Sequence, residues 1–559
     1  MLEHLVLGKT SMIFEPMIAR DIEKKRFFKE ASKEIGFTAL KTGLANLNCP
    51  YTNKYINDNF SLNMLTPISN KEKTFKNYVS KLTFFYDGEN SVYKNLGLTY
   101  LAPDFESLSH IQKIADNFGF KYYLVDPNNK KSMGLNPFAY SDPIKSALAI
   151  SSILRRMHLA NIDFNERHLT NSTEEILYQA VENLSILLKE MYPLLHDSDL
   201  PTLENLLELL NDFNEIEQLA EKMKRIPELA KKYNIQLSFI EKNFYRTAEN
   251  RNKTFSNLQL IASTIESLIR YPGIKNILCN QTNNINYDDV LKNGDIILVC
   301  TRRGDLGATV HKTFGLFVLL LMQQSVLTRP GNETTRIPHF LYIDEFAPFE
   351  CRATEDLFTL YRKYRVGTIV SAQNMAQFRN ESFRKTIMAN STTKLVFGNN
   401  LPEDNQLWEK EFGEHREWVA SRVYKTAEGS YSPDLGNIAW DWRPNVKAGQ
   451  LQGLKFKMLA YKTKDVKGRN IAGRANVNFL DSKYKEKQKI KSYNFEKFTN
   501  GINIKDEPAK AQIYDKLNIN NLVNETEIDP VKDNNFNSHY KFDDEDPIAD
   551  YNKRKNNNA

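Results

Sequence analysis

The stretch Pro338-His-Phe-Leu-Tyr-Ile-Asp-Glu-Phe-Ala-Pro348 decides the fold of this chain. Its short apolar run, 340–343, ends abruptly in two adjacent carboxylates, Asp344 and Glu345. A continuous apolar run of this length is typical of a strand that is buried inside a sheet. Two acids at the carboxyl end of such a strand can bind Mg²⁺ and orient an attacking water. The stretch therefore predicts a nucleotide-hydrolysing core.

Further apolar runs along the chain have the length and continuity of buried parallel strands. Helical patterns separate most of them, as at Leu357, Leu360, Tyr361 and Tyr364, which are spaced three, four and seven residues apart. Strands that alternate with helices predict an α/β fold with a parallel sheet. The expected strands are 4–7, 98–102, 122–125, 295–301, 340–344, 367–371 and 394–397.

The pair Asp344-Glu345 fits the Walker B element of a P-loop NTPase, with Asp344 in the Mg²⁺ shell and Glu345 polarising water. The next expected strand ends at Gln373, which is well placed to sense a γ-phosphate. The alternative for Gln373 is a cap on the following helix. Arg365 precedes that strand and could act as an arginine finger on the nucleotide of a neighbouring copy, or could be an ordinary solvated charge.

The partner of Walker B is a phosphate loop, G-x-x-x-x-G-K-[ST], whose backbone amides hold the phosphates. The best candidate contains Gly8, Lys9, Thr10 and Ser11, with Lys9 on the phosphates and Thr10 on Mg²⁺. The first glycine of the pattern is missing, since Glu3 stands in its place. We therefore expect an incomplete Walker A element and poor ATP binding, and we read the chain as truncated, started late or decayed.

Composition is compatible with this reading. The chain has 559 residues, of which 41% are hydrophobic and 26% charged, as in ordinary globular proteins. Its net charge of +6 permits nucleic-acid binding without demanding it. Four widely spaced cysteines make a zinc site or a disulfide framework improbable. The most apolar run, 315–322, is too short to cross a bilayer and predicts a buried helix.

Four regions follow from the pattern. Residues 1–162 form the first part of the NTPase domain, with the truncated Walker A element and an irregular insertion at about 20–95. Residues 163–272 are expected to be all helical, and 273–482 to complete the NTPase domain with Walker B. The tail, 483–559, is rich in Asn, Asp and Lys and is expected to be mostly disordered.

With these elements in order, the chain resembles the TraG/TraD-type coupling ATPases of conjugative type IV secretion systems. The resemblance rests on the Walker B and glutamine strands, on the strands 294–301 and 388–398, on the "DP…NPF" stretch 123–138, and on Trp442-Arg-Pro and 458–462. It implies a RecA-like P-loop NTPase core with an all-helical inserted domain. ATP and Mg²⁺ would be the cofactors.

The resemblance also implies a hexamer on the cytoplasmic side of the membrane. It would bring a relaxase and its single-stranded DNA to the secretion channel, with 163–272 as the cargo surface. Basic residues such as Arg302, Arg303, Lys363 and Arg379 could contact DNA phosphates. The chain departs from the family in its incomplete loop and in the absence of transmembrane helices ahead of it.

Two other functions stay open. One is a VirB-type ATPase that assembles the secretion channel, because such proteins share the same core. The other is a scaffold of the same fold that does not hydrolyse ATP and docks partners through its helical region.

Overall fold

The structure is a computed structural model. It describes residues 10–34, 96–161, 171–198, 200–245, 247–333, 335–398, 400–424, 433–465 and 468–486. The expected strand 4–7, most of the expected insertion at 20–95 and nearly all of the expected disordered tail lie outside these residues. All of the described residues fall in one compact unit.

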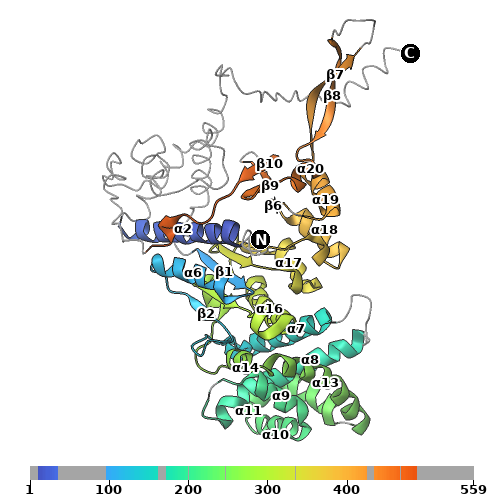
Figure 1. The fold of residues 1–559 in the computed structure, drawn as a ribbon. Coiled ribbons are helices and arrows are strands. Elements are labelled where there is room, and N and C mark those ends of the chain that lie inside the picture. Colours follow the sequence, from blue (N-terminus) through green and yellow to red (C-terminus); the bar gives the residue numbers. More distant parts are fainter. Residues whose placement is uncertain are drawn as a thin grey trace, which may run out of the picture. The chain divides into compact units, whose positions relative to one another are not determined.

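The centre of this unit is a five-stranded parallel sheet (Figure 1). Its strands run in the order β2-β3-β1-β4-β5, and all four pairings are parallel. This confirms the predicted α/β fold. The strands are β1 (Gly97–Ala102), β2 (Tyr123–Val125), β3 (Ile296–Cys300), β4 (His339–Ile343) and β5 (Val366–Val370).

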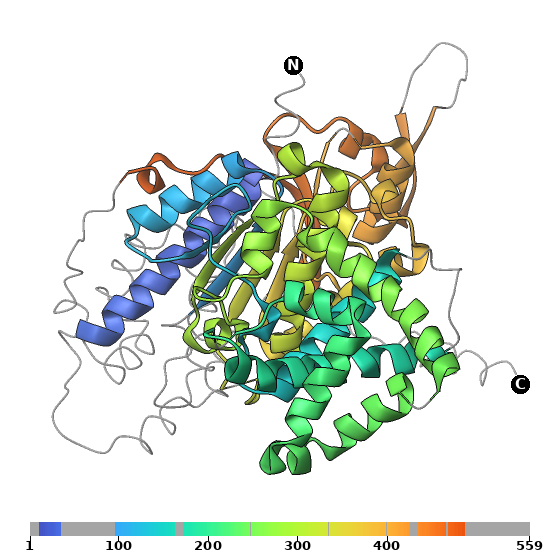
Figure 2. The ribbon, with the colours of Figure 1, turned by 90° about the horizontal axis from the view of Figure 1, so that it is seen from below.

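Alternate side chains of the strands face two different apolar layers, which explains why the strands read as continuous apolar runs. Leu98, Tyr100 and Ala102 of β1 pack with the helices α2 (Glu15–Glu34) and α6 (Phe105–Asn117). Leu101, between them, packs into the larger core on the opposite face. Figure 2 shows α2 and α6 along one side of the sheet and the green helices along the other.

The larger core is one cluster of buried side chains that includes residues of both the sheet and the helical region. A long apolar helix, α16 (Arg303–Leu327), packs against the sheet face, and further helices follow below it. These helices are α7 (Pro143–Asn161), α8 (Asn171–Leu195), α9 (Leu203–Asn211), α10 (Phe213–Lys224), α11 (Pro227–Lys232), α12 (Asn234–Ile240), α13 (Ala248–Ile269), α14 (Pro272–Leu278) and α15 (Tyr287–Asn293).

The helix α16 contains the run 315–322 and buries nearly all of it, as predicted. Within the described residues it is the one helix long and apolar enough to cross a membrane, and 61% of its apolar window is buried in the structure. Gly307 interrupts the helix with φ 83° and ψ 167°, so Arg303–Leu306 form a separate first turn.

The last expected strand was wrongly placed. Residues 394–397 do form a strand, β6 (Lys394–Phe397), but it is not part of the parallel sheet. It pairs antiparallel with β9 (Met458–Lys464), which also pairs with β10 (Asn470–Asn476). The helical pattern at 357–364 is likewise two short turns, α17 (Asp356–Thr359) and η7 (Tyr361–Tyr364), rather than one helix.

A two-stranded antiparallel hairpin, β7 (Glu414–Tyr424) and β8 (Pro433–Pro444), extends from this second sheet region (Figure 1). Trp418 lies opposite Trp440 with ring centroids 4.1 Å apart, and Arg416 lies opposite Trp442 with its guanidinium over the ring. All three tryptophans are more than half exposed. The remaining helices of this region are α18 (Glu381–Asn390), α19 (Pro402–Phe412) and α20 (Ala448–Gln452).

Candidate functional site

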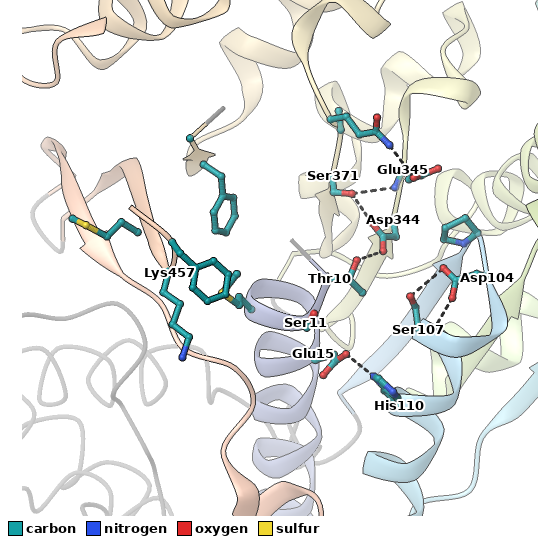
Figure 3. Close-up of a pocket in the computed structure, with 18 of the residues that line it drawn as sticks. Thr10, Ser11, Glu15, Asp104, Ser107, His110, Asp344, Glu345, Ser371 and Lys457 are labelled. Atoms are coloured by element: carbon teal, nitrogen blue, oxygen red, sulfur yellow. Dashed lines mark hydrogen bonds and ion pairs between the residues drawn. The ribbon is translucent and has the colours of Figure 1, made fainter. Parts of the chain in front are cut away.

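The candidate site lies at the carboxyl ends of β4 and β5. Asp344 and Glu345 follow β4 directly, while Ser371 and Gln373 follow β5. Because β4 and β5 are adjacent and parallel, their ends present these side chains at one edge of the sheet. Thr10 reaches the same edge from η1 (Thr10–Phe14), a single π-helical turn that leads into α2 (Figure 3).

Asp344 is the centre of the cluster. Its Oδ2 accepts a hydrogen bond of 2.6 Å from the Thr10 hydroxyl, although the two residues are 334 positions apart. Its Oδ1 accepts one of 2.5 Å from Ser371 Oγ. The carboxylate is only 5% exposed, and this burial raises its pKa, while the two hydrogen bonds act in the opposite direction. The structure thus brings the predicted residues Thr10 and Asp344 into direct contact.

Glu345 is held in a conformation that non-glycine residues rarely adopt, with φ 56°. Its backbone N–H donates to Ser371 Oγ over 3.0 Å. Gln373 Nε2 donates to Glu345 Oε1 over 3.2 Å, so the structure brings these two predicted residues together. A backbone held in this region is characteristic of functional sites, where the surroundings offset its cost of about 1–3 kcal/mol.

Sequence reasoning missed two contacts of this cluster. Ser371 joins Asp344 to the backbone of Glu345, yet a serine at a strand end carries no signal of its own. Arg303, at the start of α16, forms an ion pair with Glu345 Oε2. The preceding Arg302 forms a bidentate pair of 2.8 and 2.8 Å with the buried Asp126. Both arginines therefore have intramolecular partners, which the expectation of phosphate contacts did not anticipate.

A cavity of about 560 Å³ opens beside the cluster. One end is lined by Thr10, Ser11, Asp344, Glu345 and Gln373. The wall also includes the Glu15–His110 pair, whose Oε1 and Nδ1 atoms are 2.8 Å apart. The other end is formed by the second sheet region, through Phe397, Gly398, Asn400, Leu454, Lys455, Phe456, Lys457 and Met458. The cavity is large enough for a small organic ligand.

The donor set at the polar end suits a magnesium ion. Mg²⁺ prefers oxygen ligands and is usually held by one or two carboxylates together with substrate phosphates. The Thr10 hydroxyl and the Asp344 carboxylate supply such oxygens side by side. Ser11, the remaining described residue of the loop, also lines the cavity.

The other predicted site residues have different positions. Gly8 and Lys9 lie outside the described residues. Arg365 lies just before the amino end of β5, whereas the cluster lies at the carboxyl ends of the strands. Its guanidinium donates to the carbonyl of Arg336 over 3.1 Å. A role as an arginine finger toward another copy stays a prediction.

Comparison with known proteins gives one match in sequence and several in structure. The family profile described as "TraM recognition site of TraD and TraG" matches residues 338–439. No curated protein matches the chain.

Among solved structures, the unbound bacterial conjugative coupling protein TrwBdeltaN70 has a TM-score of 0.49 and 14% identity, over 72% of this chain and 82% of its own. The plasmid coupling protein TrwB in complex with ADP and Mg²⁺ has a TM-score of 0.45 and 14% identity, over 69% and 86%. VirB4 of Thermoanaerobacter pseudethanolicus has a TM-score of 0.35 and 15% identity, over 60% and 77%.

The segment 338–439 contains β4, β5 and the four site residues Asp344, Glu345, Ser371 and Gln373. Residues 338–439 therefore match the domain described as the TraM recognition site of TraD and TraG, and most of the residues of the candidate site lie in that segment.

Proposed function

We propose that this chain is the coupling ATPase of a conjugative type IV secretion system. It would use ATP to recruit a relaxase–DNA complex and translocate it to the secretion channel. The observation that carries the proposal is the hydrogen bond between Thr10 and Asp344. Both residues line a cavity whose walls come from segments far apart in the sequence. This bond joins Thr10 of the Gly-Lys-Thr-Ser stretch to Asp344, which lies in the segment that the TraD and TraG profile matches.

The described residues have distinct roles in this proposal. Thr10 and Asp344 would hold Mg²⁺, which when bound neutralises charge on the phosphates. Glu345 would accept a proton from the attacking water, and Gln373 would hold the Glu345 carboxylate in position through its amide.

The partners are also part of the proposal. The matching family profile is named for recognition of TraM by TraD and TraG. By analogy, a TraM-like protein would dock on the segment 338–439. Single-stranded DNA, the relaxase and channel components would be the other partners. The working form would be a homo-hexamer on the cytoplasmic side of the membrane.

The test is Mg²⁺-dependent ATP binding and hydrolysis by the full chain. We expect weak binding by calorimetry that disappears with EDTA, because the phosphate loop lacks its first glycine. Thr10→Ala and Asp344→Asn should abolish it, since each removes an oxygen ligand. Glu345→Gln should keep the binding and lose hydrolysis. Lys385→Ala, on the exposed face of α18, is the control. Binding that is unaffected by EDTA and by both ligand variants would contradict the proposal.

A further inference from the structure

The proposed reaction gives no role to the ion pair between Arg303 and Glu345. The two oxygens of Glu345 have different partners, since Oε2 contacts Arg303 Nη1 and Oε1 contacts Gln373 Nε2. Gln373 and Glu345 line the cavity, whereas Arg303 does not. Arg303 therefore contacts the carboxylate from outside the cavity.

The backbone that carries Arg303 is hydrogen-bonded to the end of β1. The Arg303 N–H donates to the carbonyl of Pro103 over 2.8 Å, and the Thr301 N–H donates to that of Ala102 over 2.9 Å. Arg302 adopts a left-handed conformation with φ 52°, and its guanidinium binds Asp126, which is 1% exposed. The turn between β3 and α16 is thereby attached to the ends of two other strands.

This turn is also separated from the helix behind it. Gly307 breaks the helical path after Leu306. The backbone of Arg303 is consequently placed by the turn and by its hydrogen bond to Pro103, not by the packing of the apolar part of α16. From this turn the guanidinium of Arg303, whose planar fork of N–H groups suits a carboxylate, meets Glu345.

We propose that Arg303 is a positioning residue for Glu345. It holds Oε2 from outside the cavity, while Gln373 holds Oε1 at the cavity wall, so that the carboxylate keeps one orientation toward an attacking water. This inference rests on the proposed function. It adds a link between the turn that follows β3 and the hydrolytic step, because a shift of that turn would move the Glu345 carboxylate.

The test compares steady-state ATP hydrolysis by the full chain and its variants. Arg303→Ala should lower kcat about tenfold or more and leave KM within about threefold, because misplaced catalytic groups cost rate rather than ground-state binding. Arg303→Lys should keep part of the rate, since a point charge remains but the fork is lost. Arg270→Ala is the matched control, a surface arginine paired with Glu266 on α13.

Added guanidinium ion separates positioning from a merely structural effect. It should restore part of the kcat of Arg303→Ala and none of the kcat of Glu345→Gln. Absence of hydrolysis in the wild-type chain would overturn the proposed function and this inference with it. Hydrolysis that Arg303→Ala leaves unchanged, or a loss that guanidinium does not restore, would overturn this inference alone.

Discussion

His311 and His339 are buried histidines that remain neutral in the folded chain. The Nδ1 of His311 lies 2.6 Å from Thr301 Oγ1, and the Nε2 of His339 lies 2.8 Å from Thr99 Oγ1. Burial, and secondarily nearby arginines, lowers the pKa of His311 to about 4 and that of His339 to about 3. Both values lie below the ordinary 6.5, so the unfolded chain takes up protons first as pH falls.

The free energy of unfolding should therefore decrease as pH drops below about 6.5, with the loss complete near pH 3–4 and roughly several kcal/mol in size. Urea unfolding at pH 7.5, 6 and 5 measures this decrease in the free energy of unfolding. His311→Asn combined with His339→Gln keeps a polar atom near each bonded nitrogen but removes the titration. The double variant should show a smaller decrease over this range, and an equal decrease would contradict the assignment.

The two acids of the candidate site could be placed at a strand end from the sequence, whereas the residues that contact them could not. Asp344 and Glu345 were predictable because two carboxylates at the end of an apolar run are unusual. Ser371 and Arg303 were not, because their contacts depend on which strands become neighbours and on the direction of one turn. In the sequence alone, a serine after a strand or an arginine before a helix looks like any polar residue that faces water.

Among the elements, α14 approaches the loop after β2 unusually closely. A Cβ added at Gly273 would lie 2.0 Å from the carbonyl oxygen of Pro127, a backbone atom that cannot rotate away. Gly273→Ala should lower the free energy of unfolding by about 1–3 kcal/mol, as overpacking does. Urea denaturation measures this, with Gly449→Ala as the control because nothing lies within 4 Å of its added Cβ. Equal stabilities of the two variants would contradict the close approach.

The elements also show where a sequence pattern stops being informative. The parallel strands were predictable because both of their faces are buried, which leaves a continuous apolar run. The run 394–397 looks the same, yet β6 pairs with β9, more than sixty residues later in the chain. Four apolar residues specify a strand but not its partner, since the partner is chosen by tertiary packing.

For the whole compact unit, the continuous core predicts one unfolding transition. The same buried cluster includes Leu101 and Val299 of the sheet, Leu184 of α8 and Ile265 of α13. We expect helices that share their core with the sheet to unfold together with it in one cooperative transition. Far-UV circular dichroism and calorimetry should give coincident midpoints, with the calorimetric and van't Hoff enthalpies equal. A separate early transition of the helices would show that the helical region unfolds on its own.

The hairpin of β7 and β8 has a consequence for spectroscopy. Of the four tryptophans in the chain, Trp418, Trp440 and Trp442 lie on it and are more than half exposed, whereas Trp408 is partly buried on α19. Intrinsic tryptophan emission from this protein therefore comes mainly from the hairpin of β7 and β8 and not from the sheet that carries Asp344. An emission change on mixing with another molecule would report on the surroundings of the hairpin, even where the candidate site around Asp344 is unchanged.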